Sequence, residues 1–231
     1  MEDKNLSLRL KAVKETVKKC RKVADIGCDH GYVPIALVSG GIAESAICCD
    51  INKGPLTGAD YNIKMAGLEG RIETRLSDGL HNITADDGVD AIVIAGMGGR
   101  LMSDILISER DKLEGVKQMV LQPQSELFLI RKAVRELSFH IESERFLKDM
   151  GKYYTVIDVL PGRVNYKEPE YTELYDIYSE YLINSKDELY LEYIRNSIKV
   201  NEGYLLNIEE AKRSPLNKKL DELRTVERLM T

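Results

Sequence analysis

The sequence contains no tryptophan, three histidines and four cysteines, and this scarcity excludes several kinds of site. The cysteines form no CxxC pair and no histidine cluster accompanies them, so neither a disulfide framework nor a metal site is expected. Reduced, mostly buried thiols are the simpler interpretation. No Cys/His pair of the kind that makes a thiol nucleophile is recognisable from spacing. The four cysteines are Cys20, Cys28, Cys48 and Cys49.

Long apolar runs are also missing. No stretch approaches the roughly 20 residues that a membrane-spanning helix needs, and the charged N-terminus lacks the apolar core of a secretory signal. We therefore expect a cytoplasmic protein that does not contact a membrane, and we expect a monomer. A hydrophobic fraction of 43% still permits a real core, and 231 residues suit one medium domain with an appendage.

Acidic residues are scarce in the first segment. Residues 1–23 carry eight basic and three acidic residues, a net +5, whereas residues 24–164 sum to −6 and residues 165–231 to −4, which gives −5 in all. A basic first helix on an acidic protein indicates an anionic partner, although a solvated helix face explains it equally well. The basic residues that would face such a partner are Arg9, Lys11, Lys14, Lys18 and Lys19.

Short apolar segments alternate with helical patterns from residue 22 to residue 138. Because these segments are apolar on both faces, they predict a buried, mostly parallel sheet with helices on each side. Two longer segments, joined at 149–151, follow and predict an antiparallel hairpin at one edge of the sheet. The five short segments read KVADIG, AESAICCDIN, RIETRLSDGL, VDAIVIAGMGG and KQMVLQPQ.

The pattern changes at GRVNYKEP, residues 162–169, and becomes helical throughout. We therefore predict a first domain at 1–163 and a second at 164–231. Two apolar stripes in the second domain have helical spacing, but the coiled-coil-like one spans only about two heptads, which indicates a helical hairpin. The stripes are Leu189, Tyr193, Ile194, Ile198, Leu205 and Ile208, then Leu216, Leu220, Leu223 and Met230.

Small or acidic residues follow the predicted strands, where a doubly wound sheet binds its ligands. The first strand ends in D-x-G-x-D-x-G, from Asp25 to Gly31. Gly27 allows a sharp turn, and Gly31 lets the next helix approach the strand. Asp29 stands where a pyrophosphate would require glycine, and its carboxylate suits a sulfonium or ammonium group instead. Ordinary turn glycines remain the alternative. Cys28 and His30 lie in the same loop.

Two further acids end the next strands. Asp50 can accept hydrogen bonds from ribose hydroxyls, as acids at this position do in nucleotide-binding folds. Asp78, before Gly79, can accept from an adenine amino group. The local alternatives are a helix N-cap for Asp50 and an Asx-turn for Asp78. Three acids at three successive strand ends favour an adenosine-containing ligand.

The fourth strand opens into AGMGG, residues 95–99. Bare backbone at this point indicates that a flat group passes close to the chain. Met97 either packs against that group or is a core methionine. The D/N-P-P-Y tetrapeptide of adenine-N6 enzymes is absent, and so is the G-x-G-x-x-G of nicotinamide-dependent Rossmann enzymes.

These motifs, in this order, resemble the bacterial tRNA (adenine-22, N1)-methyltransferase family. The resemblance covers residues 6–160 and rests on LSLRL, VADIGCDHGYVPIAL, CDINKGPL, LSDGL, IAGMGG, VLQPQ and DMGKYYTVIDV. Cys28 stands where the family motif leads us to expect serine, and Asp50 where the matching strand often ends in Glu. Both differences are chemically mild.

The resemblance implies a Rossmann-like class I methyltransferase fold with a C-terminal helical, coiled-coil-like domain, S-adenosylmethionine as cofactor and tRNA as partner. It places Ala95, Gly96 and Met97 at the methyl group and the target base. It also implies a product methylated at adenine N1 in the D-arm region. The residues expected at the cofactor are Asp25, Gly27, Cys28, His30, Gly31, Asp50, Ile51, Asp78, Gly79, Ala95 and Gly96.

Adenine N1 carries a lone pair and no proton, so its methylation needs no general base and no metal. Positioning then supplies most of the acceleration. Because the purine becomes cationic, we assign catalytic roles to a nearby carboxylate, Asp29, and to Met97. The basic residues of the first helix would bind phosphates, with residues 170–230 as a clamp. The alternatives are a methyltransferase for a small molecule or a protein, a nicotinamide-dependent oxidoreductase, and a non-catalytic RNA-binding protein.

Overall fold

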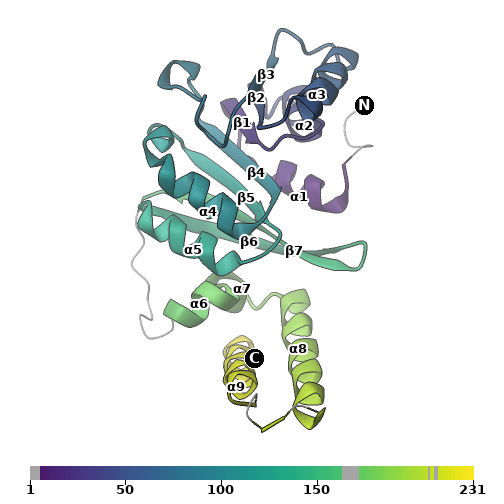
Figure 1. Ribbon diagram of the computed structural model, residues 1–231, viewed down its shortest axis with the longest axis vertical. Helices are drawn as coiled ribbons and strands as arrows, with labels where there is room; N and C mark the ends of the chain where they lie inside the picture. The colour runs from purple at the N-terminus through teal and green to yellow at the C-terminus, as the bar shows by residue number, and fades with distance from the viewer. Residues whose placement is uncertain (1–5, 163–171, 208, 211–212) are drawn as a thin grey trace. The chain divides into compact units, whose positions relative to one another are not determined.

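The computed structural model describes residues 6–162, 172–207, 209–210 and 213–231. The chain divides into two compact units, Met1–Asn165 and Tyr166–Thr231. The first unit is built on one sheet, and the second is made of helices (Figure 1). The sequence boundary predicted within 162–169 lies largely outside the described residues.

The sheet of the first unit has seven strands in the order β3-β2-β1-β4-β5-β7-β6. Strands β1 to β5 pair in parallel, β7 pairs antiparallel with β5, and β6 pairs antiparallel with β7 at the edge. This confirms the predicted parallel sheet with a hairpin at one edge. The strands are β1 (Cys20–Ile26), β2 (Ala43–Asp50), β3 (Ile72–Leu76), β4 (Ala91–Met97), β5 (Gln118–Pro123), β6 (Phe139–Asp149) and β7 (Lys152–Pro161).

Helices cover both faces of this sheet (Figure 1). On β4, Val93 belongs to the core under α1 to α3, and its neighbours Ile92 and Ile94 belong to the core under α4 and α5. Such two-sided burial explains why the strands are apolar without alternation. The helices are α1 (Leu8–Thr16), α2 (Tyr32–Ser39), α3 (Lys53–Met65), α4 (Gly99–Ser108) and α5 (Leu127–Glu136), with 3-10 turns η1 (Ala85–Asp87) and η2 (Arg110–Leu113).

The apolar positions Leu6, Leu10, Val13 and Val17 recur at helical spacing, but the first helix ends before the last of them. Ser7 caps α1 by accepting a hydrogen bond from the Leu10 N–H, and the helix ends at Thr16, so β1 already begins at Cys20. The apolar periodicity runs on past Thr16 because Val17 is buried in the extended connection to β1. Periodicity alone did not reveal that stop.

Helix α5 is fixed to the edge strand β6 by a buried ion pair. The Arg131 guanidinium donates to both carboxylate oxygens of Glu144 at 2.9 and 2.8 Å, and both side chains are at most 5% exposed. A bidentate pair in this setting fixes geometry, and removing one partner would leave a buried charge uncompensated. The pair therefore holds the hairpin in register against the sheet.

The second unit contains α6 (Thr172–Tyr178), α7 (Glu180–Asn184), α8 (Glu188–Asn207) and α9 (Arg213–Met230). Ion pairs join Arg195 to Glu227 and Arg224 to Glu202, so α8 and α9 run antiparallel. Of the predicted stripes, Ile194, Ile198, Leu220, Leu223 and Met230 are buried. Ile208 lies outside the described residues.

Candidate active site

The first strand ends in a loop shaped by two glycines. Gly27 has φ +76° and Gly31 has φ +70°, a left-handed backbone that favours glycine. The Gly27 and Cys28 N–H groups both donate to the Cys49 carbonyl on β2, at 2.8 and 3.0 Å, which ties the loop to the neighbouring strand. A Cβ on Gly31 would lie 3.2 Å from the Ala59 Cβ of α3. The left-handed turn at Gly27 fits its expected role, whereas the close approach at Gly31 is made by α3 and not by the next helix, α2.

Asp29 and His30 are the exposed residues of this loop. Asp29 has φ +50°, which is uncommon for a residue with a side chain, and its carboxylate is 74% exposed, 3.6 Å from His30 Nε2. The loop is held on α3 from below. Asn62 donates to the His30 carbonyl at 2.9 Å, and a Cβ on Gly58 would lie only 2.8 Å from His30 Nδ1. Asn62 and Gly58 were missed by the sequence motifs.

Asp25 lies beneath the loop, at the end of β1. Its carboxyl is buried, and burial, then the nearby Asp50 carboxylate, raises its pKa to about 7. A carboxyl with such a pKa gains a proton or a cationic partner at little cost. Cys28 and Cys48, buried thiols in hydrogen-bonding contact, adjoin it.

Asp50 and Ile51 end the second strand. One carboxylate oxygen of Asp50, Oδ1, accepts the Asn52 N–H at 2.8 Å, which is an Asx-turn; the N-cap of α3 is Asn52, so the helix-cap alternative for Asp50 is wrong. The other oxygen makes no hydrogen bond within the described part of the chain. Ile51 is 60% exposed, an apolar surface beside a polar strand end. One acceptor and one apolar face therefore remain for a ligand.

Asp78 and Gly79 form the turn after β3. The Asp78 carboxylate is exposed and accepts no hydrogen bond from the residues that the structure describes, so it is not the acceptor of an Asx-turn. Glu109, at the end of α4, accepts the Leu80 N–H at 2.5 Å and would lie 2.9 Å from a Cβ on Gly79. Glu109 was not predicted, and it fixes the turn that presents Asp78.

The fourth strand ends in a β-bulge at Gly96. The pairing of β4 with β5 shifts between Ala95 and Met97, and Gly96 has φ +82°. The Met97 methyl group lies 3.4 Å from a Cβ built on Gly27, so Met97 bridges the ends of β4 and β1. The bulge thus exposes bare backbone beside the first glycine loop.

Not all glycines of AGMGG need a ligand to explain them. A Cβ on Gly99 would lie 2.3 Å from the Ser125 carbonyl oxygen and 2.7 Å from that of Glu126. Gly99 is therefore required by backbone packing between α4 and the segment before α5. Of the three glycines, Gly96 is the one whose backbone faces side chains of the site, namely Arg9 and Gln124.

Arg9 lies at the ends of β4 and β5. Its Nη1 donates to Gln122 Oε1 at 2.6 Å, its guanidinium carbon lies 5.7 Å from the centre of the Tyr154 ring, and a Cβ on Gly96 would lie 3.5 Å from Nη1. Gln122 and Gln124 stand at the end of β5 in VLQPQ. Their amide side chains are polar groups at a strand end, so an expectation that covered amides as well as acids would have included them.

The other predicted basic residues do not gather around Arg9. Lys18 Nζ lies 3.4 Å from Asp158, near Gln118 at the amino end of β5, whereas Arg9 adjoins the carboxyl end of that strand. Lys11 and Lys14 are half-buried, and Lys19 is exposed. Helix α1 and the connection that follows it therefore spread these charges from the carboxyl end of β5 toward its amino end.

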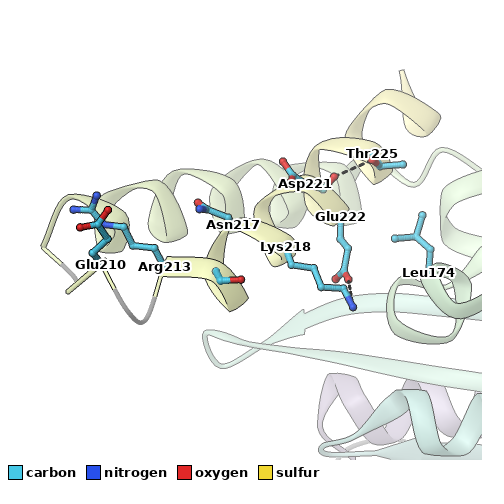
Figure 2. Close-up of a pocket in the computed structure, with 9 residues that line it drawn as sticks. Leu174, Glu210, Arg213, Asn217, Lys218, Asp221, Glu222 and Thr225 are labelled. Carbon is cyan, nitrogen blue, oxygen red and sulfur yellow. Dashed lines mark hydrogen bonds and ion pairs between the residues drawn. The ribbon is translucent and has the colours of Figure 1, made fainter.

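A groove of about 900 Å³ lies in the helical unit, on α9 and neighbouring segments (Figure 2). It contains the Lys218–Glu222 pair, at 3.9 Å. The charged residues lining it are Glu210, Arg213, Lys218, Asp221 and Glu222. Three carboxylates against two cations make this groove a poor phosphate site, and it contains none of the strand-end residues.

Neither a metal centre nor a membrane-spanning helix is found among the described residues. No group of three or more His, Cys, Asp or Glu side chains among them is arranged to hold a metal ion. No helix in the described part combines the length and apolar character that crossing a membrane requires.

Comparison with known proteins gives consistent matches. Residues 6–157 match the model of a family described as a methyltransferase domain. The tRNA (adenine(22)-N(1))-methyltransferase of Bacillus subtilis (strain 168) is 37% identical over 157 residues, which are 68% of this chain and 66% of that protein, so a third of the relative lies outside the match.

Two solved structures match over almost their whole length. The B. subtilis M1A22 tRNA methyltransferase TrmK is 30% identical, with a TM-score of 0.81 and 98% and 97% of the two chains covered. M. capricolum TrmK in complex with S-adenosyl-homocysteine is 26% identical, with a TM-score of 0.87 and 98% and 99% covered.

Proposed function

Because this chain belongs to the methyltransferase-domain family that includes the bacterial tRNA (adenine(22)-N(1))-methyltransferases, we propose that it transfers a methyl group from S-adenosylmethionine to adenine N1 of tRNA, at position 22. The observation that carries the proposal is the convergence of three acids and two left-handed glycines at adjacent strand ends, beside the bulge at Gly96. We further propose that it acts as a monomer in the cytoplasm.

The residues present fit S-adenosylmethionine. The free oxygen of Asp50 would accept from ribose hydroxyls, exposed Ile51 would cover one face of the adenine, and Asp78 would accept from its amino group. Gly27, Gly31 and the backbone of Cys28 leave room for the methionine part, next to the buried Asp25 carboxyl. Ala95, Gly79 and His30 would complete the lining of the site. When bound, the cofactor supplies an electrophilic methyl group on a cationic sulfur.

The chain's own residues have three tasks in this reaction. Asp29 would face the purine that becomes cationic at N1, and its carboxylate would stabilise that charge once substrate excludes water from the loop. Met97, fixed between Gly27 and Gly96, would support the target base by packing. No residue has to remove a proton, since N1 carries none. Orientation therefore accounts for most of the rate.

Binding of tRNA would rest on phosphate contacts, and would weaken as salt rises. N1 lies on the pairing edge of adenine, so the base must leave its stack before it can react. The proposed contacts remain Arg9, Lys11 and Lys14 on α1, with Lys18 and Lys19 in the connection to β1. The clamp role considered for residues 170–230 gains no support from charge, because residues 165–231 carry a net −4.

The decisive test is incubation of the protein with labelled S-adenosylmethionine and unmodified tRNA, followed by nucleoside mass analysis. We expect one new N1-methyladenosine per tRNA, which is lost when adenine 22 is replaced by guanine. Methylation of a metabolite or a protein but not of tRNA would contradict the proposal and favour the small-molecule or protein alternative.

A further inference from the structure

We propose that Arg9 is a positioning residue that holds a backbone phosphate of the acceptor nucleotide over Gly96, and so sets the rate of methyl transfer more than the affinity for RNA. This inference rests on the proposed function. It departs from the view of the first segment as a uniform basic face, because the contacts of Arg9 are at the carboxyl ends of the strands, whereas Lys18 contacts the amino end of β5.

The sheet topology separates two sides of the site. Asp25, Asp50 and Asp78 end β1, β2 and β3, so the cofactor side lies over those strands. Strand β4 adjoins β1, and β5 follows outward. The acceptor must approach the methyl group from the β4 and β5 side, and Arg9 stands there, between Gln122 and the Gly96 backbone.

The Arg9 guanidinium is held in place by neutral groups. Gln122 is fully buried, and its amide donates to the Pro123 carbonyl at 2.9 Å, which turns its oxygen toward Arg9. The Tyr154 ring lies against the guanidinium. The Arg9 backbone N–H donates to Asp149 at 3.1 Å, so the β6–β7 hairpin fixes the start of α1 as well.

Within the described residues, no ion pair neutralises the charge of Arg9. No carboxylate lies within 4.0 Å of the guanidinium among the described residues, and one of its N–H donors is used, on Gln122. By contrast, Arg21, Arg75, Arg131 and Arg145 each pair with an acid. A fixed, uncompensated guanidinium with free donors matches a phosphodiester, which it can bind in bidentate geometry.

A phosphate is a better partner than the target base itself. The base becomes cationic during transfer, so a guanidinium against its ring would oppose the reaction. Arginine also has no acceptor to offer the adenine amino group. On a phosphate, the same charge fixes the nucleotide without acting against the developing cation.

The test compares Arg9→Gln with wild type in steady-state methylation of tRNA. We expect kcat to fall by about tenfold to hundredfold, because misplacing a reactant costs rates of this size. The dissociation constants for tRNA and for S-adenosyl-homocysteine should stay within about threefold, roughly 0.6 kcal/mol. Arg9→Lys keeps the positive charge but not the planar, forked guanidinium, so RNA affinity should again stay unchanged and kcat should not recover. Arg21→Gln, at the amino end of the sheet, is the matched control and should leave kcat unchanged.

A second measurement separates phosphate contact from a structural role. tRNA carrying a neutral methylphosphonate on one side of the target adenosine should slow wild type about as much as Arg9→Gln does, at one of the two flanking phosphates. That tRNA should slow the Arg9→Gln variant little further. If the methylphosphonate and Arg9→Gln slowed the reaction independently, so that their effects multiplied, the inference would be overturned. A rise in KM alone, full recovery of kcat by Arg9→Lys, or loss of S-adenosyl-homocysteine binding in Arg9→Gln would overturn it as well. If wild type methylates no tRNA, the proposed function fails first, and that result is distinct.

Discussion

At the scale of single residues, the site depends on carboxyl groups in different environments. Asp25 is buried, Asp50 accepts the Asn52 N–H with one carboxylate oxygen, and Asp78 and Asp29 are exposed. The sequence shows where acids stand along the chain, but burial comes from the packing of three helices and a sheet. The burial and hydrogen bonds of each acid, and not its residue type alone, therefore determine what it can bind.

The raised pKa of Asp25 predicts a pH dependence. Since its folded-state value of about 7 lies above the ordinary 3.8, its protonated form favours folding; that stabilisation is complete below 3.8 and is lost as the pH rises through about 7. Binding of a ligand that places an ammonium group beside Asp25, as the amino-acid part of S-adenosyl-homocysteine would, has the opposite sign, because it favours the ionised carboxylate. Affinity for S-adenosyl-homocysteine should rise roughly tenfold from pH 5.5 to 7.5. Calorimetric titration at several pH values measures this dependence. The affinity of Asp25→Asn should vary little with pH, whereas an unchanged pH dependence in that variant would implicate another group.

Because Asp29 has a left-handed backbone conformation, the substitution that removes its charge must also tolerate that conformation. Asn tolerates this backbone nearly as well as Asp does, so Asp29→Asn removes the charge with little strain, whereas Asp29→Ala adds strain. Single-turnover methylation at saturating cofactor should fall at least about threefold in Asp29→Asn, or ~0.6 kcal/mol. An equal rate for Asn and wild type, with a slower Ala variant, would show that Asp29 serves the backbone only.

At the scale of elements, the cofactor loop depends on α3 as much as on β1. Gly58 makes room for the His30 ring, and Asn62 holds the His30 carbonyl. Neither lies in the glycine motif, and both come from a helix that begins more than twenty residues later. The conformation of this loop therefore depends on tertiary contacts with α3, although its sequence looks like a local motif.

Two glycines of α3 make a matched pair for testing this dependence. Gly58→Ala should weaken binding of S-adenosyl-homocysteine severalfold, because the added methyl group displaces His30. Gly54→Ala meets nothing within 4 Å, so affinity should stay unchanged while stability rises by up to about 1 kcal/mol. Calorimetry and thermal unfolding give both quantities. Equal affinities in the two variants would show that His30 is not needed where it lies.

Sequence patterns predicted the strands, their parallel order and the hairpin because buried strands are apolar on both faces and end in recognisable turns. They also placed Asp25, Asp50, Asp78 and the glycines of AGMGG at the ends of adjacent strands, but they did not predict the bulge at Gly96. They missed Gln122, Gln124 and Glu109, whose side chains look unremarkable in sequence and matter through contacts with distant elements. They also treated Arg9 as one surface charge among five.

At the scale of the whole molecule, charge is divided between segments. The first 23 residues are net positive, whereas the remaining segments are both net negative. An acidic protein that binds a polyanion must confine contact to a small area, and α1 is the part that adjoins the strand ends. Electrostatic repulsion elsewhere would then orient the RNA toward the site.

The central claim is that acids and bare backbone at the ends of β1 to β4 form a binding site for S-adenosylmethionine. Calorimetric titration of the full chain with S-adenosyl-homocysteine, with NAD as the competing candidate, tests it most directly. We expect one saturable site for S-adenosyl-homocysteine, weakened at least about tenfold by Asp50→Asn as a ribose contact is lost, and no heat with NAD. Binding of NAD, or no binding of S-adenosyl-homocysteine, would contradict the claim.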